Sequence, residues 1–182
     1  MEIIKPDLKK AVKTIKSGRV LVCPTDTVYG LVCDFKNKEA VERLYKIKKR
    51  PKWKPLPVFV KDIKMAKKLA HIDSKQEEFL KKIWPGAVTA VLPKKNKRWT
   101  IGIRVPKYNW LLDLVEQLNW PLAESSANIS GRPASTKIKE VLKQFDGQKY
   151  QPDLVIDAGN LKKSKPSKVI DLTIWPPKIL RQ

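Results

Sequence analysis

Short apolar runs alternate with helix-length amphipathic segments along the whole chain, and this alternation limits the fold more than any other feature of the sequence. Residues 20–23 form the first predicted strand, and the apolar positions from Leu8 to Ile15 before it follow helical spacing. Further strands are predicted at 56–60, 88–92, 101–105, 121–123, 154–157, 168–172 and 178–180. The interleaving indicates an α/β or α+β fold, in which helices flank one mixed β-sheet.

Several predicted helices begin at polar side chains that can cap the first turn. Asn109 precedes the apolar stripe of one helix, and Ser135 or Thr136 precedes that of another. Ser74 and Glu77 have the spacing of a capping box, so a further helix is predicted to begin there.

Polar side chains gather immediately after two of the predicted strands. Residues 24–31, PTDTVYGL, contain two threonines, an aspartate and a tyrosine, and residues 124–131, ESSANISG, contain three serines, an asparagine and a glutamate. Each stretch can be a turn in which these side chains hydrogen-bond their own backbone. Strands of one sheet can bring their ends together, so several such clusters favour a binding site over isolated turns.

Cationic side chains accompany these polar stretches. Six lysines and arginines lie between Lys46 and Lys54, more than the dipole of the preceding helix requires. Arg104 falls inside a predicted buried strand, where it must face an anion or a carboxylate. Fixed cations and hydroxyls stabilise a transferring phosphoryl or nucleotidyl group by electrostatics and positioning, without a protein nucleophile.

The net charge is +21, with 39 Lys and Arg against 18 Asp and Glu, and the pI is near 10.0. Such a field attracts polyanions, including nucleic acid, nucleotides and anionic membrane surfaces. A lysine-rich proteome or a thermophilic source would give a similar balance with no partner. If the basic surface is an RNA footprint, the loop expected at 94–98, with Lys94, Lys95, Lys97 and Arg98, would belong to it.

Several classes of site are disfavoured. The sequence contains neither a GxxxxGK[ST] loop nor a GxGxxG motif. His71, the single histidine, lies at the end of a predicted helix, where a catalytic triad is not expected. Cys23 and Cys33 with one histidine cannot form a four-ligand zinc site, so buried free thiols are expected.

Length and composition favour one domain spanning residues 1–182. No apolar run is long enough to cross a bilayer, and the first residues lack the apolar core of a signal peptide. We therefore expect a soluble, cytoplasmic protein with no membrane partner.

A set of motifs occurs in order along the chain: PTDTVYGL at 24–31, KKRP running into KPL at 48–56, WPGAVT at 84–89, IRVP at 103–106, SSANISG at 125–131, and PSKVID followed by ILR at 166–181. Through these motifs the chain resembles the YrdC-like family of threonylcarbamoyl-AMP synthases over nearly its whole length. Each motif alone is modest, whereas the ordered set is highly specific. The resemblance implies a YrdC/RibB-like fold, a twisted mixed sheet with a positively charged concave face.

The resemblance implies an enzyme, a nucleotidyltransferase that joins L-threonine, bicarbonate and ATP into threonylcarbamoyl-adenylate and releases pyrophosphate. The product would supply the threonylcarbamoyl group that downstream tRNA threonylcarbamoyl transferase proteins place on adenosine 37 of tRNA. Mg²⁺ is expected with the triphosphate, held mostly by phosphate oxygens, and no protein metal ligand is implied.

The resemblance also implies roles for particular residues. Lys48 and Arg50 would act in catalysis. The ATP site would contain Arg50, Lys54, Thr100, Ser126, Asn128 and Arg181. The threonine site would contain Thr27, Arg104 and Ser167, and Arg104 would face the carboxylate of threonine.

Three residues depart from the family pattern. Phe59 stands where some relatives carry a histidine, so a histidine role in threonine binding does not transfer. Lys168 follows Ser167 where a threonine is usual. Glu124 stands where a small residue is common and would place a carboxylate close to the ligand site, so threonine specificity is less secure than nucleotide binding.

Two other functions stay open from the sequence. An RNA-binding protein of the same fold without synthase activity would suit the net charge of +21. Weak binding of double-stranded RNA or tRNA is expected alongside synthase activity as well. The second of these other functions is a carbamoyl-transfer step in metal-centre maturation, which the same domain performs inside larger multidomain proteins. The expectation of a single domain disfavours this function.

Overall fold

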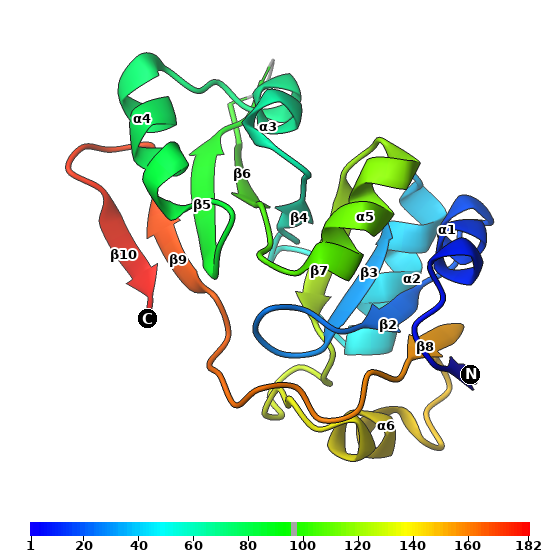
Figure 1. The fold of residues 1–182 in the computed structure, drawn as a ribbon. Helices are drawn as coiled ribbons and strands as arrows, with labels where there is room; N and C mark the ends of the chain where they lie inside the picture. The colour runs from blue at the N-terminus through cyan, green and yellow to red at the C-terminus, as the bar shows by residue number, and fades with distance from the viewer. Residues whose placement is uncertain (96–97) are drawn as a thin grey trace.

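The computed structural model describes residues 1–95 and 98–182 (Figure 1). The strands are β1 Glu2–Ile4, β2 Leu21–Cys23, β3 Gly30–Asp34, β4 Val58–Phe59, β5 Val88–Pro93, β6 Thr100–Arg104, β7 Leu122–Ser126, β8 Leu154–Ile156, β9 Lys168–Asp171 and β10 Lys178–Arg181. The helices are α1 Leu8–Lys16, α2 Lys38–Lys48, α3 Ile63–Leu69, α4 Ser74–Ile83, α5 Asn109–Leu118 and α6 Ile138–Phe145. Within the described chain, no helix is long and apolar enough to cross a membrane.

The strands form one 10-stranded sheet in the order β1-β8-β2-β3-β7-β4-β6-β5-β9-β10. Parallel and antiparallel pairs both occur, which confirms the predicted mixed sheet. β7 runs antiparallel to both β3 and β4. The pairing of Gly30 with Ser126 joins the start of β3 to the end of β7, so the two polar stretches identified in the sequence lie side by side.

Alternate residues of the strands pack into two hydrophobic clusters. On β2, Leu21 and Cys23 join the cluster that contains side chains of α1, α3, α4 and α5, whereas Val22 joins the cluster of α2 and α6. Figure 1 shows α1 and α5 in front of the strands and α2 behind them. The predicted flanking helices are therefore confirmed, and they cover both faces of the sheet.

After β8 the chain runs back across the molecule to reach β9 near the other edge of the sheet (orange in Figure 1). Three hydrogen bonds tie this return segment, residues 157–167, to the 24–31 stretch, and in one of them the Ala158 backbone N–H donates to the Tyr29 hydroxyl at 3.1 Å. The Tyr29 hydroxyl donates to the Gly159 carbonyl at 2.7 Å, and the Ser164 hydroxyl donates to the Thr27 carbonyl at 2.6 Å. The return segment therefore passes beside the polar ends of the central strands.

Two predicted helix starts are wrong by one residue. Asp73, rather than Ser74, is the N-cap of α4, and the capping box pairs Asp73 with Gln76. Asp73 and Gln76 bond each other's backbone N–H groups, as Ser74 and Glu77 would have done one residue later, so two overlapping matches compete and the earlier one forms. Asn109 is the first residue of α5, whose N-cap Tyr108 makes no side-chain cap bond.

The third predicted helix also begins later than expected. α6 begins at Ile138, with Lys137 as its N-cap. The Ser135 hydroxyl accepts from the Lys137 backbone N–H at 2.9 Å and donates to Glu140 at 2.6 Å, so this serine closes the turn before the helix. The strands β1 and β3 were not predicted; β3 begins at Gly30, inside the stretch that was interpreted as a loop.

Both thiols are predicted to be unreactive in the folded protein. Cys23 and Cys33 are free and fully buried. Burial raises the pKa of Cys23, with a further contribution from the charge of Glu124, and burial raises the pKa of Cys33 to about 12. A raised pKa makes the reactive thiolate form of Cys33 much scarcer at slightly alkaline pH than that of an exposed thiol. Labelling with a thiol reagent should require denaturant; native labelling as fast as that of a free thiol would contradict this placement.

Candidate functional site

A cavity of about 550 Å³ lies beside the end of β7, the start of β3, the end of β4 with the segment before it, and parts of β5, β6 and β9. Its lining includes every residue to which the resemblance assigned a role. These residues are Thr27, Lys48, Arg50, Lys54, Thr100, Arg104, Ser126, Asn128, Ser167 and Arg181. Polar clusters that are far apart in the sequence thus meet around one space.

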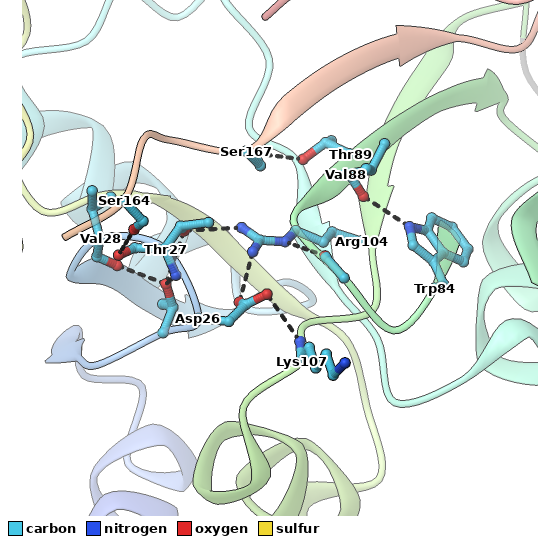
Figure 2. A network of polar contacts seen from close by, with 12 residues as sticks. Asp26, Thr27, Val28, Trp84, Val88, Thr89, Arg104, Lys107, Ser164 and Ser167 are labelled. Carbon is cyan, nitrogen blue, oxygen red and sulfur yellow. Dashed lines mark hydrogen bonds and ion pairs between the residues drawn. The ribbon is translucent and has the colours of Figure 1, made fainter. Parts of the chain in front are cut away.

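Arg104 on β6 lies at the centre of a buried polar network (Figure 2). Its Nη2 donates to Asp26 Oδ1 at 2.6 Å, and the two side chains are 3% and 11% exposed. Its Nε donates to the Gly86 carbonyl at 3.0 Å and its Nη1 to the Thr27 hydroxyl at 3.3 Å. The prediction that Arg104 faces an anion or a carboxylate is confirmed, with Asp26 as its partner.

The turn that carries Asp26 is held partly by its own side chains. The Thr25 hydroxyl donates to the Val28 carbonyl at 2.7 Å and accepts from the Thr27 backbone N–H at 3.0 Å. Asp26 instead reaches beyond the turn, where its Oδ2 accepts from the Lys107 backbone N–H at 3.1 Å. The local-turn interpretation is therefore correct for Thr25, while Asp26 contacts β6 and the loop that follows it.

Lys48 is a buried cation, 4% exposed, at the end of α2. Its Nζ donates to the Ser126 carbonyl at 2.7 Å and to Asn128 Oδ1 at 2.8 Å. Burial, with the neighbouring charge of Arg50 acting in the same direction, lowers the pKa of Lys48 from 10.5 to about 8. The ammonium group thus holds the 125–131 stretch against α2, and its direct action in catalysis stays a prediction.

Arg50 organises the segment that leads into β4. Its Nε donates to the Lys54 carbonyl and its Nη2 to the Pro55 carbonyl, both at 3.0 Å. Within the described chain Nη1 has no hydrogen-bond partner. The Lys54 Nζ lies 4.9 Å from the centre of the Trp53 ring, and Trp53 is 76% exposed. Arg50 and Lys54 therefore line the part of the cavity that opens to solvent.

On the other side of the cavity, Arg181 of β10 holds the end of the return segment. Its Nη2 and Nε donate to the Ser167 carbonyl at 2.7 and 3.0 Å. The Ser167 and Thr89 hydroxyls lie 3.0 Å apart, so one donates to the other (Figure 2). Thr100 begins β6 and is exposed; no side-chain hydrogen bond to it is found in residues 1–95 and 98–182.

Two polar residues of this region were not predicted. Thr89 is the last residue of the WPGAVT motif, and its place in that motif could have marked it as a candidate site residue. Ser164 lies in the lysine-rich return segment, and nothing in the surrounding sequence distinguishes it from a solvated serine. Its position next to Thr27 depends on how the chain crosses the sheet after β8.

The three departures from the family pattern lie in different surroundings. Glu124 is 8% exposed and lines the cavity. Phe59 lies on β4, and the face of its ring is turned to Arg104. The guanidinium carbon of Arg104 lies 5.7 Å from the centre of the Phe59 ring. Lys168 begins β9, is exposed, and does not belong to the cavity lining. Of the three, only Glu124 brings a charge into the cavity.

Asn128→Ala is expected to destabilise the protein more than Ser126→Ala. The Asn128 amide donates to the Ile129 and Arg132 carbonyls at 3.0 and 2.6 Å, and its Oδ1 accepts from Lys48 and Ser126. Truncation leaves these groups unpaired at a cost of about 1–3 kcal/mol, against about 1 kcal/mol or less for the serine. Denaturant unfolding of both variants measures the difference. Equal free energies of unfolding for the two variants would contradict the structural importance of the Asn128 hydrogen bonds.

The family model of Sua5, YciO and YrdC proteins, described as telomere recombination, matches residues 13–182. The threonylcarbamoyl-AMP synthase of Pyrococcus abyssi is 36% identical over 176 residues, which cover 92% of this chain and 51% of the relative. The threonylcarbamoyl-AMP synthase of Bacillus subtilis is 35% identical over 153 residues, which cover 79% of this chain and 44% of the relative.

A solved structure, that of P. abyssi Sua5 complexed with L-threonine, superposes with a TM-score of 0.89 at 34% identity. The match covers 99% of this chain and 56% of that one. The chain thus spans about half the length of these relatives.

Proposed function

Because the chain belongs to the Sua5/YciO/YrdC family, we propose that it is a threonylcarbamoyl-AMP synthase, which joins L-threonine, bicarbonate and ATP and releases pyrophosphate. The cavity carries this proposal, because cationic and hydroxyl side chains from distant parts of the chain line one space of about 550 Å³. Clefts of that size suit small-molecule ligands. Relatives at 36% and 35% identity bear the name of this activity.

The triphosphate of ATP is proposed to lie against the cations on the solvent side of the cavity. Arg50 would contact it through Nη1, Lys54 would add positive charge beside Arg50, and Arg181 would add positive charge from the other side of the cavity. Such fixed charges stabilise the pyrophosphate leaving group as negative charge develops on it. Lys48 would act mainly by holding the loop in place. The remaining nucleotide contacts are assigned to Thr100, Ser126 and Asn128.

The amino acid is proposed to lie next to Thr27, Arg104 and Ser167. The relative solved with L-threonine supports an amino-acid site in this fold. Arg104 uses Nε and one N–H of each terminal nitrogen in the buried network, so a second N–H on each is available for a substrate carboxylate. Asp26 would then fix the guanidinium plane for that contact.

The proposed reaction needs positioning, charge neutralisation and exclusion of water. The amine of threonine takes up carbon dioxide or bicarbonate as a carbamate, a carbamate oxygen attacks the α-phosphorus of ATP, and pyrophosphate leaves. No protein nucleophile takes part. Mg²⁺ entering with ATP would be held by phosphate oxygens, since the described residues offer no group of three acidic, histidine or cysteine side chains that could hold a metal ion.

We further propose that the product passes to tRNA threonylcarbamoyl transferase proteins in the cytoplasm. The net charge of +21 supports weak RNA binding that turnover does not require. Of the cations expected from the sequence to lie in a basic loop at 94–98, Lys97 lies outside the described residues, and Lys94, Lys95 and Arg98 do not belong to the cavity lining. The logarithm of tRNA affinity should then fall linearly with the logarithm of salt concentration.

Pyrophosphate release by the purified protein tests the proposed activity. Release should require ATP, threonine and bicarbonate together, because the carbamate is the nucleophile and forms only when both smaller substrates are present. ATP turnover that ignores threonine would contradict the synthase assignment. RNA binding combined with no pyrophosphate release would favour the RNA-binding alternative.

A further inference from the structure

Glu124 is a buried carboxylate for which the described residues provide no hydrogen bond or ion pair. It lies on β7, where its backbone N–H donates to the Pro57 carbonyl at 2.9 Å, and its side chain lines the cavity. Only 8% of the residue is exposed. Among the described residues that line the cavity, Glu124 is the sole acid. The carboxylate oxygens are not among the fully buried unpaired polar atoms of the described residues, so they reach the space of the cavity. Acidic side chains on mostly buried residues are usually paired, so an unpaired one facing a cavity is a candidate ligand contact.

Cations surround Glu124 without touching it. Lys48 approaches from α2, Arg50 from the segment after α2, Arg104 from β6 and Arg181 from β10. Within the described chain none of them lies within ion-pair distance of the carboxylate, and Arg104 is already paired with Asp26 at 2.6 Å. Cys23 is the other titratable neighbour, and it is neutral because its pKa is raised by burial.

We infer that Glu124 receives the α-ammonium group of the amino-acid substrate and takes one of its protons. The inference rests on the proposed synthase function, which brings an amino acid into this cavity. A zwitterionic amino acid carries one anionic and one cationic group. The cavity offers cations for the anionic group, and among its described lining residues Glu124 alone carries a negative charge that can attract the cationic group.

The proton transfer supplies the nucleophile that the reaction needs. Ammonium gives a proton to the carboxylate, leaving a neutral amine and a protonated Glu124. The amine nitrogen then forms a bond to the carbon of bicarbonate, and water leaves, so that amine and bicarbonate yield a carbamate anion and one water molecule. The proton on Glu124 returns to solvent when the product leaves. Atoms and charge balance without an oxidant or a further reactant.

The surroundings of Glu124 suit a group that accepts a proton. Burial raises the pKa of Glu124, while the charges of Arg104, Arg181, Lys48 and Arg50 lower it, and burial prevails. When bound phosphates neutralise Arg50 and Arg181, part of the lowering effect is lost. The pKa of Glu124 should therefore rise further in the nucleotide complex, closer to the neutral range in which a general base works well.

Glu124→Gln tests the inference, because it removes the charge and keeps the shape. Near neutral pH, kcat/KM for threonine should fall about 100-fold, the low end of the usual effect of a general base. The KM for ATP should stay the same or decrease, since a negative charge next to the phosphates is lost. Glu78→Gln is the matched control, because Glu78 is an exposed carboxylate on α4 paired with Lys82, and it should leave both values unchanged.

The pH profile separates proton transfer from a structural role. In the unmodified protein, kcat/KM for threonine should fall as pH decreases through the pKa of Glu124, because the protonated acid cannot accept a proton. Glu124→Gln should lack that acid limb, and its defect should shrink in alkaline solution, where free amine is abundant. A constant defect at all pH values would overturn the inference. Glu124→Asp, which keeps a carboxylate, should recover part of the activity; a loss equal to that of Glu124→Gln would also overturn it.

Failure of this inference is distinguishable from failure of the proposed function. If the unmodified protein releases no threonine-dependent pyrophosphate, the synthase assignment fails first, and the inference falls with it. If the unmodified protein is active and Glu124→Gln stays within about threefold of it near neutral pH, only the role of Glu124 is wrong. Circular dichroism of each variant checks that it folds, and Gln is expected to fold because it removes an unpaired buried charge.

Discussion

Arg104→Met is expected to lower the free energy of unfolding by about 3–5 kcal/mol, because it leaves the Asp26 carboxylate buried without its partner. The two side chains are 3% and 11% exposed and 2.6 Å apart. Among the described residues, only the Lys107 backbone N–H, at 3.1 Å, would still donate a hydrogen bond to the carboxylate. In a chain of this length the loss should lower the melting temperature by about 6–20 °C. Denaturant unfolding and a thermal melt measure both effects.

The paired variant Asp26→Leu with Arg104→Met is the control for this prediction. Removing both charges leaves neither one unpaired, so the double variant should be more stable than Arg104→Met alone. Strict additivity of the two single effects would show that the ion pair contributes no coupling and would contradict the network in Figure 2. Synthase activity should stay low in both variants, because the proposed carboxylate contact is lost.

Arg50→Ala is expected to lower kcat by roughly 30- to 1000-fold, equivalent to about 2–4 kcal/mol of lost charge stabilisation in the transition state. Arg50→Lys should recover only part of this, because an ammonium group cannot reproduce the planar guanidinium that bonds Lys54 and Pro55 while facing the ligand. Steady-state pyrophosphate release gives kcat and KM for each variant.

Lys52→Ala is the matched control for Arg50→Ala. Lys52 lies two residues away, is exposed, and pairs with Glu42 at 3.1 Å outside the cavity. It should leave kcat nearly unchanged, as expected for a surface salt bridge. Full activity in Arg50→Ala would remove this segment from the proposed active site.

Helical spacing and short apolar runs were sufficient to predict most of the elements, and the family resemblance supplied the residues assigned to the cavity. The apolar stripe from Leu8 to Ile15 became α1, and the polar stretches at 24–31 and 124–131 met at the junction of β3 and β7. β3 was missed because Gly30 resembles a turn residue and the apolar run after it is short. β3 is buried because it pairs with β2 and β7, and the local sequence carries no information about that pairing.

Partners of charged residues were harder to predict than their positions. Arg104 required an anionic partner, but the sequence did not show whether that partner is Asp26 or a ligand. Arg104 and Asp26 lie 78 positions apart in the sequence, so local patterns do not reveal their contact. The resemblance assigns Lys48 a role in catalysis, which stays a prediction, but the sequence does not show that its ammonium binds the Ser126–Asn128 loop. The side chains that settle such choices come from loops, helix α2 and strands that are far apart in the sequence, and only the fold brings them together.

The identity of the nucleotide product tests the synthase assignment most directly. The protein would be incubated with ATP labelled at the α-phosphate, labelled threonine and labelled bicarbonate, and the nucleotides would be separated at once, because mixed anhydrides hydrolyse readily. We predict one adenylate that contains all three labels in equal amounts, formed together with pyrophosphate. An adenylate that contains threonine without the carbon of bicarbonate, or AMP alone without any threonine-containing intermediate, would contradict the proposed activity.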